Sequence, residues 1–334
     1  MPKQQKKHTF LIMLVFFSFA LAGCNNYNSL NPISETRLLL DTLCTITIFD
    51  QSKQGLLTET LDLCEKYESL FSRTIEGSDI WRINNSQGSP VVVERQTAEL
   101  IQTGLEYGAF SGGLFDITIG RLSSLWDFNN QPAVPSPADL AAALNSVDYR
   151  QVLVAGTSIQ LNNAEAWLDL GGIAKGYIAD QLAAFLKERG IESAVIDLGG
   201  NIVTIGVKPD GKLWHIGVEQ PFSEHSKIIG SLAIGEASIV TSGIYERQFI
   251  ENGELYHHIL NPASGMPAES DVISATIVSE SSAVGDALST ITILLGSEKA
   301  ATLLAQTPGL LGALLMLNSG ELLQYGDIDF RGSK

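Results

Sequence analysis

Residues 168–180, LDLGGIAKGYIAD, concentrate groups that could contact a phosphate. They combine three glycines, Lys175 and two aspartates at an apparent passage from a strand into a helix. Glycine-rich turns that open a helix bind phosphate through main-chain N–H groups and the helix dipole. This segment fits neither GxGxxG nor GxxxxGK[ST]. The spacing therefore predicts an anion site of another kind.

A second candidate lies near the C-terminus, in GDALST at residues 285–290. If this segment is helical, Asp286 and Thr290 lie one turn apart on one face. A carboxylate and a hydroxyl are hard oxygen ligands of the kind that Mg²⁺ or Ca²⁺ prefers. The same spacing also occurs on helices that bind no metal, so the pair alone does not define a site.

Residues 257–267, HHILNPASGMP, could supply a base. His257 and His258 end a strand-like run, so their side chains should point to opposite faces. One of them could act as a general base near neutral pH, and the alternative is a structural histidine. Arg247 could clamp a phosphate, or could pair with Glu246 or Glu251.

Residues 112–128, GGLFDITIGRLSSLWDF, place two aromatic side chains near a small-residue turn. Phe115 and Trp126 could stack on a planar ring, or could belong to the core.

The elements that must position these groups are mixed in type. Several hairpin-like β segments alternate with amphipathic helices, which favours an α+β fold over a doubly wound sheet. DLGG occurs at residues 169–172 and 197–200, and neighbouring strands would bring both corners to one sheet edge. In the first half of the domain we expect a strand over 37–50, a helix over 54–71, a strand and helix over 91–113, and a short helix within 132–150. Next we expect strand–helix–strand over 166–201, with the helix ending at Gly190. The rest should hold β segments at 215–221, 230–243 and 247–260, a helix from about 281, and a last helix and strands to 330.

The N-terminus has the pattern of a bacterial lipoprotein. A lysine-containing start precedes an apolar run that is short for a membrane span, and LAGC at residues 21–24 matches a lipobox. The alternative is an ordinary cleavable signal peptide. We expect a signal peptide over 1–23, a lipidated (palmitate-bearing) Cys24, a tether over 24–35, and a domain over 36–330 facing the periplasm from the inner or outer membrane of the cell envelope.

Charge and cysteine content narrow the function classes further. The net charge is −16, and no Lys/Arg cluster in the body of the chain could bind nucleic acid. Cys44 and Cys64 remain after lipidation of Cys24. They could form a disulfide in an exported protein or stay as two buried thiols, and no zinc-type spacing is present.

Together these motifs resemble the ApbE family, the FAD:protein FMN transferases of the bacterial envelope. The resemblance spans residues 36–330, and the motifs follow one another in the order typical of the family. It rests on LDTLCTITIFD, FSRTIEGSDIWRIN, GLFDITIGRLSSLWDF, LDLGGIAKGYIAD, DLGGN, TSGIYER, HHILNPASGMP and GDALST.

The resemblance implies an α+β (T-fold-like) architecture and a chemistry. That chemistry is Mg²⁺-dependent cleavage of FAD, with FMN transferred to a threonine hydroxyl and AMP released. The implied acceptors are subunits of the sodium-pumping NADH:quinone oxidoreductase or of Rnf-type complexes. Two alternatives stay open: an Mg²⁺-dependent FAD pyrophosphatase giving FMN and AMP, and a non-catalytic FAD-binding lipoprotein.

The resemblance also assigns site residues. His258 takes the place of the base that deprotonates the incoming threonine, and Gly172 (through its main-chain oxygen), Asp286 and Thr290 would bind the metal. Asn84 is an alternative to Thr74 near the nucleotide. The residues expected to contact FAD are Leu40, Thr42, Thr74, Leu114, Phe115, Asp116, Asp169, Lys175, Arg247 and Ile259.

The chain departs from the family pattern at two places. NPASG stands where the family has DPxTG, so Asn261 replaces an aspartate and Ser264 a threonine. Activity would change if that aspartate orients the histidine or a second metal. Leu40 stands where the family often has methionine, which alters a packing contact.

Overall fold

The computed structural model describes residues 31–223 and 227–333. The predicted signal peptide, Cys24 and the start of the predicted tether lie outside these residues. Within them, no helix is both long and apolar enough to cross a membrane.

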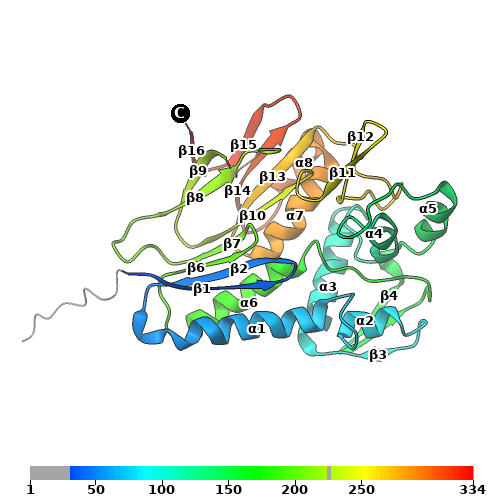
Figure 1. Cartoon of the computed structure of the whole chain (residues 1–334), viewed down its shortest axis with the longest axis horizontal. Helices are drawn as coiled ribbons and strands as arrows, with labels where there is room; N and C mark the ends of the chain where they lie inside the picture. The colour runs from blue at the N-terminus through cyan, green and yellow to red at the C-terminus, as the bar shows by residue number, and fades with distance from the viewer. Residues whose placement is uncertain (1–30, 224–226, 334) are drawn as a thin grey trace, which may run out of the picture.

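A central antiparallel sheet organises the chain (Figure 1). Every neighbouring pair of its strands is antiparallel, so the sheet is built from hairpins and crossovers rather than from βαβ units. In sheet order the strands are β1 (Ile33–Leu39), β2 (Thr42–Ile48), β6 (Ala194–Leu198), β7 (Asn201–Ile205), β10 (Ala237–Gly243), β13 (Val272–Ser279), β14 (Leu310–Leu317) and β15 (Leu322–Gly326).

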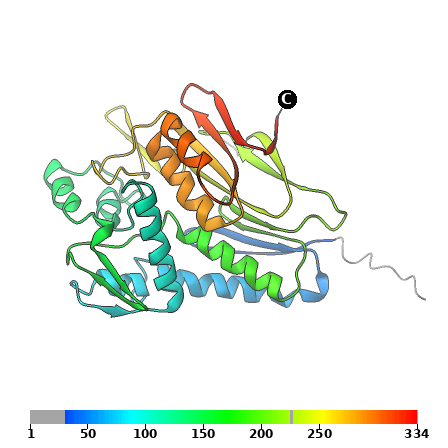
Figure 2. The ribbon, with the colours of Figure 1, turned by 180° about the vertical axis from the view of Figure 1, so that it is seen from behind.

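The two faces of the sheet are covered differently. On β13, Ile277 packs with the helices, whereas the next residue, Val278, packs with a smaller sheet on the other side, as strand alternation requires. Figure 2 shows the helices grouped on one face. These helices are α1 (Gly55–Phe71), α6 (Ala174–Glu188), α7 (Ser282–Leu295) and α8 (Ser297–Ala305), and the smaller sheet is β8 (Trp214–Glu219), β9 (Ile228–Ile234) and β16 (Asp329–Gly332).

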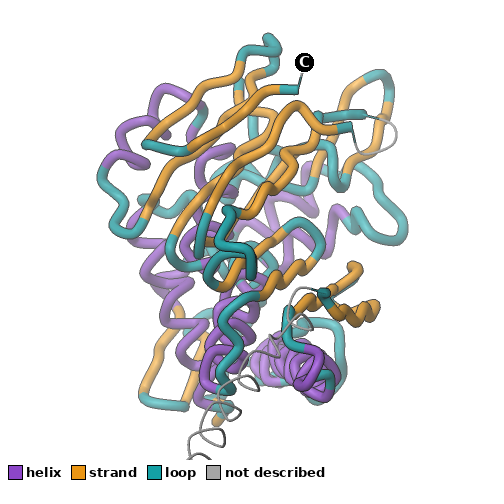
Figure 3. Tube along the Cα trace, turned by 90° about the vertical axis from the view of Figure 1, so that its left-hand side faces the viewer, coloured by secondary structure: helices purple, strands orange, loops and turns teal. Residues whose placement is uncertain are grey.

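A second region extends the helical face at one end. Its hairpin, β11 (Gln248–Glu251) with β12 (Glu254–His257), packs on α4 (Gly120–Trp126) through aromatic rings. The rings of Trp126 and Tyr256 lie tilted, with their centroids 5.5 Å apart. Figure 3 shows the whole arrangement with helices in purple and strands in orange. The remaining elements are η2 (Gln51–Lys53), α2 (Asp79–Asn84), β3 (Val91–Val92), α3 (Arg95–Phe110), α4 (Gly120–Trp126), α5 (Pro137–Leu144), η3 (Tyr149–Gln151), β4 (Val152–Ala155) and β5 (Ser158–Leu161).

The α+β fold class is confirmed, and two local expectations are wrong. The segment 37–50 is a hairpin, because Leu40 and Asp41 turn the chain with φ of 55° and 58°, the pattern of a type I′ turn. Residues 166–170 belong to none of the sheets of the described chain; Trp167 alone makes an isolated parallel bridge, to Ile119. The two DLGG corners therefore do not end neighbouring strands. The first opens α6 and the second ends β6.

Candidate active site

The start of α6 and the first turns of α7 cross in direct contact. The main-chain N–H of Gly176 donates to Oδ2 of Asp286 at 2.8 Å. A Cβ added at Gly176 would lie 2.3 Å from the carbonyl oxygen of Ser282, so only glycine permits this approach. The crossing places the candidate phosphate-binding segment 168–180 against α7, the helix that carries the two candidate metal ligands Asp286 and Thr290.

Asp180 holds the same two helices together from the other side of the crossing. Its carboxylate accepts from the Ser281 hydroxyl at 2.6 Å, and from the main-chain N–H groups of Ser282 at 2.7 Å and Ala283 at 3.1 Å. It thereby caps α7 from α6. Our sequence interpretation gave Asp180 no role. Its position about one and a half helical turns after Lys175 was the only sequence feature that could have drawn attention to it.

The three residues predicted to bind a metal are gathered at this crossing. A Cβ built on Gly172 would lie 3.8 Å from Oγ1 of Thr290 and 2.9 Å from the ring of Phe115. Asp286 lies one turn before Thr290 on α7 and is 4% exposed. Burial raises the pKa of its carboxyl group, and Lys175 opposes that shift.

This donor set fits a divalent cation. The carboxylate of Asp286 accepts one hydrogen bond among the described residues and forms no ion pair there, so its buried charge is incompletely compensated. The other donors would be the Thr290 hydroxyl and the main-chain oxygen of Gly172, both hard oxygens. In the described part of the chain, no cluster of three His, Cys, Asp or Glu side chains could hold a metal, so any site here depends on these neutral oxygens.

His258 follows β12 and lies near the cationic side chains. Its pKa is lowered to about 3, mainly by burial and then by Arg247, with a smaller effect of Lys175. Its Nδ1 has no hydrogen-bond partner among the described residues, although the side chain keeps some accessible surface. Burial also raises the pKa of Glu246, and Lys175 and Arg247 oppose this shift. The charges of Lys175 on α6 and of Arg247 therefore act on both Glu246 and His258, which places these side chains near one another.

The two histidines have separate environments, as strand alternation predicts. His257 is buried, and its Nε2 lies 3.3 Å from the carbonyl oxygen of Ala268. His258 is the one that faces the charged groups, and its main-chain N–H donates to the carbonyl oxygen of Arg247 at 3.1 Å. The Arg247 side chain is exposed and forms no direct ion pair within the described residues, although its charge acts on the nearby carboxylate of Glu246. Ile259, next in the chain, is buried in the apolar cluster around α7 and α8.

Asp169 is engaged by a residue that our sequence interpretation did not assign. Arg73 Nε lies 3.1 Å from Asp169 Oδ2, and Arg73 Nη1 donates to the Ser124 hydroxyl at 2.9 Å. The other carboxylate oxygen accepts from Gly171 N–H at 2.9 Å. Thr74, the neighbour of Arg73, is exposed. The FSR motif was the signal for Arg73, because it supplies a cation to the region where a nucleotide is expected.

Asp116 and Asn84, which were predicted to lie near FAD, use their side chains for hydrogen bonds within the protein. Asp116 accepts from both the N–H and the hydroxyl of Thr118 and from Tyr149 N–H, and its buried carboxyl has a raised pKa. The amide of Asn84 is paired with the main chain of Leu168 in both directions, at 2.7 and 2.9 Å. These side chains therefore fix the loops around the site, while Leu114 is partly exposed beside Asp116.

The β1–β2 turn brings two further predicted contacts to the end of β6. A Cβ at Gly199 would lie 2.1 Å from Oγ1 of Thr42, so the second DLGG corner is packed against this threonine. The N–H of Leu40 donates to Glu68 of α1 at 2.8 Å. Leu40 has a positive φ, which is costly for leucine and is typical of a position held by its surroundings.

Asn261, which stands where the family has an aspartate, forms a turn that either residue could make. Its side-chain oxygen accepts from Ala263 N–H at 2.9 Å, and its carbonyl accepts from Gly265 N–H at 2.8 Å. Trp126 Nε1 donates to the Gly265 carbonyl at 2.8 Å and anchors the turn. An aspartate oxygen would make the same Asx turn, so asparagine preserves the backbone here.

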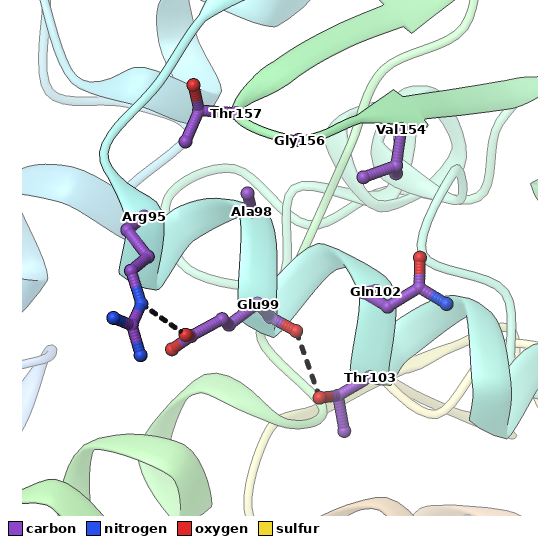
Figure 4. Close-up of a pocket in the computed structure, with 8 residues that line it drawn as sticks. All are labelled: Arg95, Ala98, Glu99, Gln102, Thr103, Val154, Gly156 and Thr157. Carbon is purple, nitrogen blue, oxygen red and sulfur yellow. Dashed lines mark hydrogen bonds and ion pairs between the residues drawn. The ribbon is translucent and has the colours of Figure 1, made fainter.

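A separate hollow of about 530 Å³ lies between α3 and the β4–β5 turn (Figure 4). None of the predicted site residues lines it. Its wall includes Arg95 and Glu99, which pair with each other at 2.7 Å. The hollow is therefore distinct from the helix crossing.

Comparison with known proteins assigns this fold and helix crossing to a family of flavin transferases. Residues 40–315 match the ApbE family. A protein named FAD:protein FMN transferase from Treponema pallidum (strain Nichols) is 34% identical, over 89% of this chain and 88% of its own length. One of the same name from Klebsiella pneumoniae (strain 342) is 35% identical, over 83% and 89%.

Solved structures give the same result. The ApbE protein from Thermotoga maritima is 30% identical with a TM-score of 0.81, over 88% of this chain and 97% of that one. The flavin transferase ApbE from Vibrio cholerae is 26% identical with a TM-score of 0.78, over 88% and 96%. This chain belongs to the ApbE family, as its motifs predicted.

Proposed function

We propose that this chain is an FAD:protein FMN transferase that requires Mg²⁺. It moves FMN from FAD to a threonine hydroxyl of an acceptor protein and releases AMP. The observation that carries the proposal is the helix crossing, where Gly172, Asp286 and Thr290 lie together near Lys175 and His258. Relatives over most of the chain bear the name of this activity.

The chain's own groups can bind and orient the pyrophosphate. Lys175 lies in the first turn of α6, where main-chain N–H groups and the helix dipole favour an anion. Arg247 is exposed and has no carboxylate partner in the described chain, which leaves its guanidinium available. Two cations and a helix N-terminus together provide the positive charge that a strongly acidic protein otherwise lacks.

His258 is the proposed base for the threonine hydroxyl. Its low pKa keeps the imidazole neutral at physiological pH, so its ring nitrogen can accept a proton. A bound pyrophosphate would offset the positive charge of Arg247 and Lys175 and so remove that part of the lowering of the pKa of His258, while the larger effect of burial remains. Substrate binding thereby strengthens the base at the moment it is needed.

Asp286, Thr290 and Gly172 are the residues that would hold Mg²⁺. The ion, when bound, supplies neutralisation of charge on the phosphate oxygens. Asp286 contributes the charged ligand, and its hydrogen bond from Gly176 orients the carboxylate. Asp169, with Arg73, would face the adenine side together with Leu114 and Phe115, and Leu40 and Thr42 would face the flavin.

The placement of the enzyme follows from its N-terminus. We propose lipidation at Cys24, anchorage in the cell envelope and a periplasm-facing domain. Acceptors would then be membrane redox subunits with an exposed threonine, such as those of the sodium-pumping NADH:quinone oxidoreductase or Rnf-type complexes.

The test is a flavinylation assay with purified chain, FAD, Mg²⁺ and an acceptor domain. We expect a fluorescent covalent adduct on the acceptor, read in a denaturing gel, together with AMP. Release of free FMN and AMP without an adduct would instead identify an FAD pyrophosphatase. Retention of intact FAD without turnover would identify a flavin-binding protein.

A further inference from the structure

Cys44 and Cys64 lie on facing surfaces of β2 and α1. Cys44 is on the inward face of β2 with Ile46, and Cys64 is one turn after Leu61 on the inward face of α1. Both cysteines are 0% exposed and belong to the same apolar core, where they are free thiols.

Contacts between the edge strand β1 and α1 fix the position of the β1–β2 hairpin against this helix. Arg37 is the cross-strand partner of Cys44. Its guanidinium pairs with Asp62 at 2.6 Å and approaches Glu65 to 3.9 Å. These two carboxylates flank Cys64 in sequence, so the strand position of Cys44 is held opposite the helix position of Cys64.

A second contact fixes the other end of the same interface. The N–H of Leu40 donates to Glu68, one helical turn beyond Cys64, at 2.8 Å. With the Arg37 contacts, it brackets the two cysteines on both sides. Cys44 Sγ donates to the Leu39 carbonyl oxygen at 3.4 Å. The neighbouring thiol of Cys64 lowers the pKa of Cys44, and the neighbouring thiol of Cys44, together with burial, raises the pKa of Cys64.

We propose that Cys44 and Cys64 form an intramolecular disulfide in the cell, linking β2 to α1. The proposal rests on the proposed export of the chain, not on flavin transfer, since disulfides persist in oxidising compartments. The oxidant is an external disulfide of a thiol oxidoreductase or a small molecule. One cysteine thiolate attacks it to form a mixed disulfide, the second displaces the carrier thiol, and the carrier leaves as two thiols.

The bond must form before the core closes, because neither sulfur is accessible in the folded chain. It would fix the β1–β2 turn, with Leu40 and Thr42, against α1. This turn is one of the flavin-facing elements proposed above, so the cross-link would hold part of the site in place.

The test is peptide mapping of the full chain from bacterial cells quenched in acid and alkylated before digestion. Trypsin cuts after Arg37, Lys53 and Lys66, which leaves the two cysteines on separate peptides, 38–53 and 54–66. We expect these peptides as one linked species, lighter than the two free peptides by two hydrogens, that separates on reduction. Recovery of both as alkylated free thiols would overturn the proposal.

Thermal unfolding supplies a second measurement. A disulfide closing a loop of this size is expected to raise the Tm by about 5 °C. A reducing agent should therefore lower the Tm of the oxidised chain and leave the Cys44→Ala/Cys64→Ala double variant unchanged. Equal responses of the two proteins would contradict the cross-link. Neither measurement reads flavin transfer, so failure here and failure of the proposed activity are distinguishable.

Discussion

Replacing Asp286 by asparagine should separate the stability of the fold from its response to metal. Asparagine keeps a side-chain oxygen for the Gly176 N–H bond of 2.8 Å but removes the charge. Burial raises the pKa of Asp286, which means that the ionised form is costly in the metal-free protein. We expect Asp286→Asn to stabilise the metal-free chain by about 1 kcal/mol.

The response to Mg²⁺ should change in the opposite sense. At a free concentration of about 100 Kd, a bound ion stabilises the native state by about 2.7 kcal/mol, or roughly 4 °C in Tm for a chain of this size. Asp286→Asn should lose nearly all of this increment, and its transfer rate should fall at least about 10²-fold.

The assay is a thermal melt with and without Mg²⁺, beside the flavinylation assay. Asp79→Asn is a matched control: Asp79 is also buried, but it pairs with Arg82 and accepts from Glu94 N–H and Thr97 away from the crossing. This control should lower the baseline Tm and keep the full Mg²⁺ increment. An unchanged increment in Asp286→Asn would refute the metal assignment.

Three further predictions concern the base and the crossing. His258→Ala should keep FAD binding in a fluorescence titration and slow transfer about 10²-fold, whereas His257→Ala should mainly lower the Tm. The reverse pattern would show that His257, and not His258, is the base. Because the pKa of His258 is lowered from 6.5 to about 3, the unfolded chain binds a proton that the native chain refuses, so the free energy of unfolding should fall as pH drops from 6.5 toward 3. Denaturant titrations at several pH values should show that the free energy of unfolding of His258→Gln falls less steeply with decreasing pH than that of the unaltered chain. Parallel pH dependences of the two proteins would argue against the lowered pKa of His258. Gly176→Ala places a Cβ 2.3 Å from the Ser282 carbonyl oxygen and should cost about 3 kcal/mol in chemical denaturation; a cost near zero would show that the helices can separate freely.

The sequence specified most local structure, because the relevant signals lie within a few residues of one another. Apolar spacing located α1, and Gly190 ends α6 with a φ of 73°, as a C′ glycine should. The spacing of Asp286 and Thr290 anticipated one face of α7. Ordered motifs were enough to indicate the ApbE family.

Local patterns failed where long-range packing decides the conformation. The strand-like alternation over 37–50 hid the Leu40–Asp41 turn, which has no glycine and is held in part by Glu68 of α1. Residues before Asp169 read as a strand, yet in the described chain they pair only with the 117–120 segment through one isolated bridge, and Asn84 holds the main chain of Leu168.

The sequence by itself determined the chemical groups and the helices and strands that carry them, since side-chain type and periodicity are local properties. Only the tertiary structure decided which groups meet. Gly176 and Asp286 are 110 residues apart, and their hydrogen bond exists because two helices on one sheet face cross at a glycine. The pairing of Arg73 with Asp169 and the facing of Cys44 and Cys64 likewise depend on packing between distant segments, which no spacing along the chain encodes.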